Sequence, residues 1–216
     1  MIPILSSLEA FDLDKSTIDF AYTSGEQLMD GAGRLSAQFI IERINNPFNK
    51  KFVIFAGPGN NGGDGIICHY YLTYYGIHST LVLLNKSIKT SWIFKKYSIS
   101  NDSILIYSDK YRISFDFWYI DCIFGIGFNK ASKGNYRKVI KSLNDVRNII
   151  SIDIPSGIYC DSGIADDYYI KARFTLAMGY YKLGYYFNTG IDASGDVYPL
   201  DIGLQPLEYP TEHIYC

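Results

Sequence analysis

The hydrophobic positions of the chain follow two different periods. Leu28, Ala32, Leu35 and Phe39 lie three or four positions apart, which is typical of one face of a helix. A continuous apolar run at residues 52–56 is instead typical of a strand buried on both faces. The two patterns are separated by Asn45, Asn46 and Pro47, residues that interrupt regular structure.

Two predicted helices open the chain, and each begins with the spacing of a capping box. Ser6 precedes Glu9 by three residues, and Ser24 precedes Gln27 in the same way. Further helices are expected at residues 65–75, 92–97 and 136–143. Further strands are expected at residues 80–84, 104–107, 118–124, 149–154, 174–178 and 197–202.

Short buried strands that alternate with helices predict an α/β fold with a mainly parallel sheet and helices on both faces. No shift in composition divides the chain, so we expect a single domain over residues 1–216, with an N-terminal helical arm packed against it. In such sheets ligands bind beyond the carboxyl ends of the strands, so the residues after each strand are the candidates for function.

Composition excludes several classes of protein. Hydrophobic residues make up 48% of the chain and charged residues 19%, which does not fit a disordered protein. The formal net charge of −2 gives no broad attraction to nucleic acid or to an acidic membrane. No apolar stretch approaches the ~18–20 residues of a membrane-spanning helix, and no secretory signal opens the chain, so we expect a cytoplasmic protein. The four cysteines lack C-x-x-C spacing and are expected to be reduced.

The segment after the first strand is rich in glycine. Residues 57–65 read G-P-G-N-N-G-G-D-G and include the pattern G-x-G-x-x-G. The N-terminus of the following helix would direct free N–H groups at this loop, which suits a phosphate. No Asp or Glu occurs from Gly65 to Asn101, so the ribose-binding acid of an ordinary dehydrogenase is missing, and no G-K-[ST] completes a P-loop. A connection without a ligand is the alternative.

Two aspartates and a lysine follow other strands. Asp121 lies in an apolar run, where a carboxylate must be paired, hydrogen-bonded or bound to a cation, or must cap backbone N–H groups. Asp153 precedes the Pro155–Gly157 turn and is a candidate acid-base group, or a structural residue that holds the turn. Lys182 could face the same site as a cation or proton partner, although a single loop lysine is more often solvated.

Taken in order, these segments resemble the N-terminal domain of YjeF, the NAD(P)H-hydrate epimerase family. The resemblance rests on the glycine loop, on D-C-I-F-G-I-G at residues 121–127, on D-I-P-S-G at residues 153–157, on K-L-G at residues 182–184 and on D-I-G at residues 201–203. The segment 27–33, Q-L-M-D-G-A-G, also fits. The resemblance covers nearly the whole chain.

The resemblance implies a Rossmann-like three-layer α/β/α sandwich, usually a homodimer, that interconverts the R and S forms of hydrated NADH or NADPH. It implies a bound K⁺ ion, with ligands from Asn61, Asp121 and Ser156. It also implies contacts between substrate and a set of residues from three segments: Asn60, Asn61, Gly62, Gly63, Asp64, Gly125, Ile126, Gly127, Phe128, Asn129, Lys130, Ala131 and Asp153. Some members continue into a dehydratase domain, so this chain is expected to be fused to a dehydratase or to work with one.

The residues are consistent with that chemistry. The amide, carboxylate and hydroxyl of Asn61, Asp121 and Ser156 are oxygen ligands of the kind that hard cations prefer. Loss of the hydroxyl from the hydrated carbon gives an iminium ion, and water can return to its other face. We expect Asp153 to transfer the protons and Lys182 to tune Asp153 or bind phosphate. A non-catalytic nucleotide-binding module or a dimeric scaffold of the same fold is the alternative, and a dehydrogenase is disfavoured by the missing ribose acid.

Overall fold

The computed structural model describes residues 3–20, 22–85, 90 and 92–205. A seven-stranded sheet with the order β4-β3-β2-β5-β6-β7-β9 lies at its centre, and every pair of neighbouring strands in it runs parallel. Its strands are β2 (Lys51–Ala56), β3 (His78–Leu83), β4 (Ile104–Ile106), β5 (Trp118–Cys122), β6 (Ile149–Ile152), β7 (Phe174–Met178) and β9 (Asp196–Leu200).

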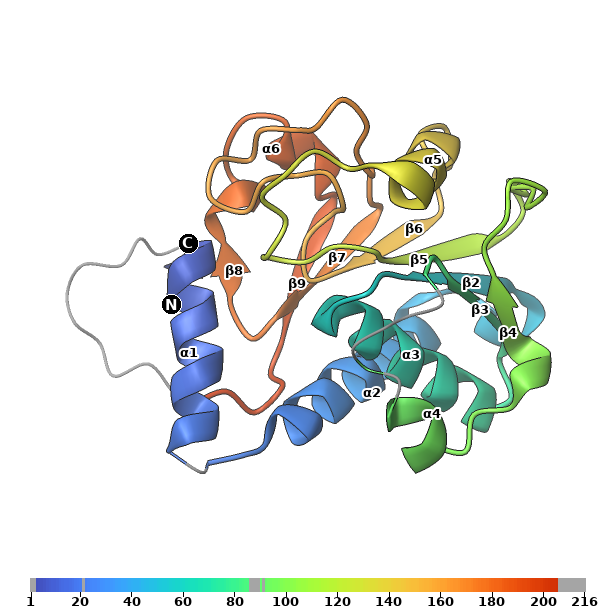
Figure 1. The fold of residues 1–216 in the computed structure, drawn as a ribbon, viewed down its shortest axis with the longest axis horizontal. Helices are drawn as coiled ribbons and strands as arrows, with labels where there is room; N and C mark the ends of the chain where they lie inside the picture. The colour runs from blue at the N-terminus through green and yellow to red at the C-terminus, as the bar shows by residue number, and fades with distance from the viewer. Residues whose placement is uncertain (1–2, 21, 86–89, 91, 206–216) are drawn as a thin grey trace.

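Helices cover both faces of the sheet, which confirms the three-layer α/β/α fold (Figure 1). On one side lie α2 (Gly25–Arg43), α3 (Asn60–Tyr74) and α4 (Trp92–Lys96), and on the other lie α5 (Gly134–Ser142) and α6 (Gly190–Ala193). The first helix, α1 (Ser7–Asp19), stands beside the sheet as the expected N-terminal arm. That residues 1–216 form a single domain stays a prediction.

Alternate residues of the central strands build two separate cores. Phe52 and Ile54 of β2 pack with α2 and α3, whereas Val53 and Phe55 pack with Val139 and other residues around α5. Both faces of β2 and β5 are therefore buried, which explains why these strands read as continuous apolar runs rather than as alternating ones.

Both predicted capping boxes are present. The Ser6 and Ser24 hydroxyls accept hydrogen bonds from the backbone N–H groups of Glu9 and Gln27, whose side chains in turn accept from the capping residues. These contacts satisfy donors that a helix N-terminus leaves free, and they set where α1 and α2 begin.

The structure differs from the sequence-based expectation at α3, which begins at Asn60 and not at Gly65. Gly62, Gly63 and Gly65 are consequently part of the helix rather than of a loop, whereas Gly57 and Gly59 precede it. Glycine is a poor helix former, but here close packing requires it: a Cβ on Gly62 would lie 2.1 Å from the carbonyl oxygen of Gly57, and one on Gly63 would lie 2.5 Å from Met29 Sδ.

Other strands end earlier than expected, and one small sheet was not anticipated. β5 ends at Cys122 and β6 at Ile152, so the residues that follow are free to face a ligand. The short strands β1 (Ile4–Leu5) and β8 (Tyr181–Lys182) pair in parallel, with Leu5 opposite Lys182. Two-residue strands carry no hydrophobic period, so the sequence gives no signal for them.

Cys68, Cys122 and Cys160 are unpaired and buried, as expected of reduced thiols, whereas Cys216 lies outside the described residues. Among the residues that the structure describes, no helix is long and apolar enough to cross a membrane.

A buried histidine joins α3 to the sheet, and it makes stability depend on pH. The ring nitrogens of His69 lie 2.9 Å from the Ser79 and Ser103 hydroxyls, and burial lowers the pKa of His69 from 6.5 to about 4. The unfolded chain therefore binds a proton between these pH values that the folded chain does not. We expect the free energy of unfolding to fall as pH decreases from 6.5 to 4, by up to about 3 kcal/mol from this group.

Urea unfolding of the wild type and of the His69→Gln variant from pH 7 to pH 4 measures this contribution. The variant should be less stable at pH 7 and should lose less stability on acidification. His78→Gln is the matched control, because His78 lies exposed at the start of β3. Parallel pH curves for the wild type and His69→Gln would contradict the assignment.

Candidate active site

The site lies at the point where the order of the strands reverses. From β2 the chain passes through α3 to β3 on one side, and later returns to β5 on the other side of β2. The connections that leave β2 and β5 therefore diverge, which opens a crevice at the carboxyl ends of these strands, where ligands bind in open α/β sheets. The side-chain amide of Asn61 spans this crevice by donating to the carbonyl oxygen of Phe124 at 2.8 Å.

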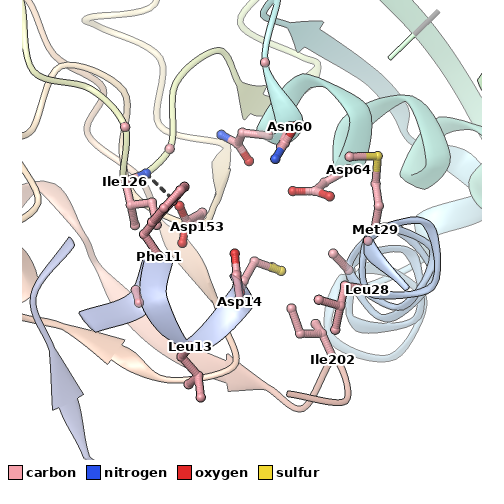
Figure 2. A pocket seen from close by; sticks show the side chains of 18 of the residues that line it. Phe11, Leu13, Asp14, Leu28, Met29, Asn60, Asp64, Ile126, Asp153 and Ile202 are labelled. Carbon is pink, nitrogen blue, oxygen red and sulfur yellow. Dashed lines mark hydrogen bonds between the residues drawn. The ribbon is translucent and has the colours of Figure 1, made fainter. Parts of the chain in front are cut away.

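A cavity of about 690 Å³ occupies this crevice. Its walls come from α1, α2, the start of α3, the segment after β5, the end of β6 and β8 (Figure 2). Leu13, Leu28, Met29 and Ile202 give it apolar surface, and polar groups converge on it from α1, the start of α3, the end of β6 and β8. A largely apolar cavity with a few convergent polar groups is the usual form of a small-molecule site.

The N-terminus of α3 borders the cavity. Gly59 and Asn60 line it, and a Cβ built on Gly59 would meet no atom within 4 Å. By contrast, a Cβ on Gly57 would lie 1.9 Å from the carbonyl oxygen of Ile123. The glycines of this segment therefore have different roles: Gly57 permits packing of the chain on itself, whereas Gly59 leaves the helix N-terminus open for a ligand.

Asp153 and Lys182 form a buried ion pair at the cavity wall. Asp153 Oδ1 lies 2.9 Å from Lys182 Nζ, and Asp153 Oδ2 accepts a hydrogen bond from the N–H of Ile126 at 2.9 Å (Figure 2). The Lys182 side chain is 2% exposed, and its ammonium group also donates to the carbonyl oxygen of Met178. Lys182 is thus not the solvated loop lysine that was the alternative interpretation.

The backbone of Asp153 is held in an unusual conformation. Its φ of 71° lies in the left-handed region, which costs energy for a residue other than glycine. Its N–H donates to the carbonyl oxygen of Leu176, and its own carbonyl oxygen accepts from the hydroxyl of Tyr185. Gly125 completes the arrangement, because a Cβ there would lie 2.6 Å from Asp153 Oδ2. Contacts on all sides therefore fix the direction of this carboxylate.

Beneath the cavity, a fully buried carboxylate connects the segments after β5 and β6. Asp121 accepts hydrogen bonds from the hydroxyl and the N–H of Ser156, at 2.6 and 2.8 Å, and from Ser151 and Ile123. Burial raises the pKa of Asp121, and these hydrogen bonds oppose the rise. The capping of backbone N–H groups, which was one interpretation of Asp121, is therefore present.

The same region fits a monovalent cation. Asn61 Oδ1 is buried and has no hydrogen-bond partner among the described residues, and none of the ion pairs formed within them includes Asp121. The carbonyl oxygen of Phe124 and the hydroxyl of Ser156 lie in the same cluster, since Ser156 Oγ is 3.4 Å from that carbonyl oxygen. Neutral oxygens with one buried carboxylate are suitable ligands for a hard cation such as K⁺.

Two more carboxylates face the cavity. Burial raises the pKa of Asp64 well above its usual range, and the charges of Asp153 and Asp14 raise it further. Burial and the charge of Asp153 raise the pKa of Asp14 to about 6, against the lowering effect of Lys182. Sequence reasoning missed Asp14, because α1 also carries Glu9, Asp12 and Asp19 and nothing in the pattern singles out one acid.

The structure brings most of the expected site residues together. The main cavity is lined by Asn60, Asn61, Asp64, Gly125, Ile126, Gly127, Phe128, Asp153 and Lys182. Asn129 lines an adjoining cavity of about 400 Å³, which shares Phe11 and residues 126–128 with the first. Gly62 and Gly63 are packed inside the fold, and Lys130 and Ala131 are exposed and line neither cavity.

Several known proteins are similar to this chain in sequence or in fold. The chain is 34% identical over 198 residues to the NAD(P)H-hydrate epimerase of Elusimicrobium minutum, which covers 82% of this chain and 85% of that protein. It is 31% identical to the NAD(P)H-hydrate epimerase of Oenococcus oeni, over 93% of this chain and 96% of that one. It is 30% identical to the bifunctional NAD(P)H-hydrate repair enzyme Nnr of Thermofilum pendens, but spans only 37% of the length of that enzyme.

A crystal structure of the yeast protein ynu0 superimposes with a TM-score of 0.74 at 22% sequence identity, over 86% of this chain and 84% of that one, which shows that the fold is shared. The family model for the YjeF-related protein N-terminus matches residues 25–184. This match and the relatives together show that the chain belongs to the family of YjeF-related N-terminal domains.

Proposed function

We propose that this chain is an NAD(P)H-hydrate epimerase, which interconverts the R and S forms of hydrated NADH and NADPH as a step of cofactor repair. Relatives with 31–34% identity over most of the chain carry that name. The observation that supports the chemistry is the Asp153–Lys182 ion pair, which holds one carboxylate oxygen beside a cavity large enough for the nicotinamide half of a dinucleotide.

The reaction needs a proton-transfer group and a polar wall that binds the rest of the substrate. In our proposal Asp153 protonates the departing hydroxyl, the ring nitrogen stabilises the iminium ion with its lone pair, and water returns to the other face. Lys182 keeps the carboxylate of Asp153 in place through the ion pair. The free N–H groups at the start of α3 bind the pyrophosphate, and Gly59 leaves them accessible.

In this proposal a K⁺ ion would be held by Asn61 Oδ1, Asp121 and Ser156, together with the carbonyl oxygen of Phe124, which lies in the same cluster. When bound, the ion would supply a positive charge beside the buried carboxylate of Asp121 and beside an anionic substrate. By sharing this ion, Asn61 and Ser156 would hold the segment 123–128 in a fixed position against α3.

The partners of the protein follow from the same proposal. We infer a small-molecule dinucleotide as substrate, a homodimer, residence in the cytoplasm, and cooperation with a dehydratase, since the relative from Thermofilum pendens is named a bifunctional repair enzyme. Analytical ultracentrifugation tests the dimer, because a sedimentation mass near twice the 24.5 kDa of the chain is expected.

A coupled assay tests the activity. The R form of hydrated NADH is supplied with an excess of a dehydratase specific for the S form, and recovery of NADH is followed by absorbance with and without this protein. Acceleration over the spontaneous rate supports the epimerase. Nucleotide binding without acceleration would favour a non-catalytic nucleotide-binding module, and neither binding nor acceleration would favour a scaffold.

Replacement of Asp153 by Asn should reduce kcat by about 10²–10⁴-fold, because the amide cannot transfer the proton. The matched control is Asp145→Asn, which removes an exposed carboxylate that lines neither cavity. Retention of most activity in folded Asp153→Asn protein would exclude Asp153 as the acid-base group.

Removal of potassium should lower activity if Asn61 is a cation ligand. Activity measured in KCl and in choline chloride of equal ionic strength should differ severalfold for the wild type. The Asn61→Leu variant, which lacks the ligand oxygen, should show low activity and no difference between the two salts. Equal rates of the wild type in both salts would rule out a role for the ion in activity.

Substitution of Gly59 by Ala should weaken substrate binding and leave stability nearly unchanged, because the new methyl group meets no protein atom within 4 Å and lies at the mouth of the helix N-terminus. An increase in KM of about 10-fold corresponds to about 1.4 kcal/mol. Gly62→Ala is the contrasting variant, because its Cβ would lie 2.1 Å from a carbonyl oxygen and should lower thermal stability instead. An unchanged KM for Gly59→Ala would show that the ligand does not approach Gly59.

A further inference from the structure

The helix α1 is a fixed wall of the active-site cavity. At its start the N–H and hydroxyl of Ser7 donate to the carboxylate of Asp161, at 2.5 and 2.7 Å. Near its end the buried hydroxyl of Thr17 accepts from the N–H of Gln205. Since Leu5 pairs with Lys182 just before the helix begins, α1 is also connected directly to the strand that carries the active-site lysine.

This anchoring turns Asp14 toward the cavity. Thr17 of the same helix is fully buried in the fold, whereas Asp14 lines the cavity with its carboxylate among the other charged groups (Figure 2). Within the described part of the chain the carboxylate of Asp14 accepts no hydrogen bond, whereas that of Asp121 accepts several and that of Asp153 contacts both Ile126 and Lys182. A carboxylate that is placed in a site but not engaged by the protein is available to a substrate.

The charged surroundings of Asp14 suit proton transfer at neutral pH. The titratable groups that line the cavity around it are Asp64 on α3, Asp153 after β6, Lys182 on β8, Lys15 on α1 itself, and Tyr180. With a pKa of about 6, Asp14 can both gain and lose a proton near neutrality. Burial raises the pKa of Asp64 as well, and the charges of Asp153 and Asp14 add to that rise.

Inversion at the hydrated carbon requires proton transfer on two faces of the ring. The hydroxyl leaves from one face and water adds to the other, so a single carboxylate would have to reach around the ring, or the ring would have to turn over within the cavity. Asp153 and Asp14 come from different walls, at the end of β6 and on α1, and both point into the same space (Figure 2).

We propose that Asp14 is a second catalytic residue, which transfers a proton on the face of the nicotinamide ring opposite to the face that Asp153 serves. This inference rests on the epimerase function proposed above and deepens it, because it assigns one carboxylate to each epimer.

The step balances without any further reactant. In one direction Asp153, after taking up a proton from solvent, gives that proton to the hydroxyl oxygen, the C–O bond breaks, and the nitrogen lone pair forms the C=N bond, so that water leaves. Water on the other face then forms the new C–O bond, the C=N electron pair returns to nitrogen, and the surplus proton passes to the carboxylate of Asp14. The enzyme resets when the proton returns from Asp14 to Asp153 through solvent, and the reverse reaction uses the two residues in exchanged roles.

The first test compares Asp14→Asn with Asp12→Asn in the coupled assay. Asp12 lies exposed two residues away on α1, so its replacement removes the same charge from the same helix outside the cavity. We expect Asp14→Asn to lower kcat by about 10²–10⁴-fold, with KM changed less than about threefold, and Asp12→Asn to behave like the wild type. A change in KM with kcat preserved would overturn the proposal, since Asp14 would then only bind substrate.

The second test separates proton transfer on one face from inversion. The hydrates are incubated with enzyme in H₂¹⁸O, and both the label in the hydroxyl and the configuration are measured, with the spontaneous reaction subtracted. In Asp14→Asn protein Asp153 still transfers protons on its own face of the ring, so the epimer whose hydroxyl lies on that face should take up label without inversion. In Asp153→Asn protein the other epimer should do so.

Three outcomes overturn the proposal while the epimerase function stands. The first is equal activity of Asp14→Asn and Asp12→Asn, and the second is loss of label uptake and of inversion in the same proportion in Asp14→Asn. The third is label uptake without inversion in Asp64→Asn and not in Asp14→Asn. If Asp14→Asn does not fold, Asp14→Glu decides by the same exchange measurement, since the displaced carboxylate should slow inversion more than label uptake. Failure of the epimerase function itself is distinguishable, because the wild type would then show neither reaction.

Discussion

The buried carboxylate of Asp121 is the constraint on which the site depends. It sits at the end of β5 and receives hydrogen bonds from Ser151 in β6 and from Ser156 beyond it, so that one side chain sets the spacing of two strand ends and of the segments that leave them. Ser156 passes this constraint on, because its hydroxyl accepts from the N–H of Phe124, whose carbonyl oxygen in turn accepts from Asn61 on α3. Breaking one partner in such a buried network leaves another polar group without a hydrogen bond, which is more costly than the loss of an exposed contact.

Above this network several acidic side chains lie close together, which a purely structural fold would avoid. Asp14, Asp64 and Asp153 share one cavity with Lys182, and burial raises the pKa values of the first two. A carboxyl group whose pKa is raised on folding lowers stability as pH rises through that pKa, because the folded chain holds a proton that the unfolded chain has released. The site therefore makes the fold less stable near neutral pH than it would be without these acids. Such a loss of stability is common where a functional site holds groups with perturbed pKa values.

Much of this could be predicted from sequence, for identifiable physical reasons. Strands that are buried on both faces, such as β2, leave continuous apolar runs, and an aspartate in such a run, such as Asp121, must have a compensating contact. The start of α3 at Asn60 could not be predicted, because Gly62 and Gly63 disfavour a helix locally and are required only by the tertiary packing of Gly57 and Met29. Asp14 was hidden for a similar reason: the pairing of β1 with β8 and the contact of Ser7 with Asp161, both distant in sequence, decide which acid of α1 enters the cavity.

The anchoring of α1 also bears on where the domain should be considered to begin. The family model starts to match at residue 25, the first residue of α2, and a protein expressed from that position would contain the whole seven-stranded sheet. It would lack Leu5, which pairs with Lys182, and α1, which forms one wall of the cavity. Such a shortened protein would have an incomplete cavity even if it folded, so its measured activity would not represent that of the family. The domain boundary used for expression, and for comparing the functions of relatives, is therefore better placed before β1 than at the first recognisable motif.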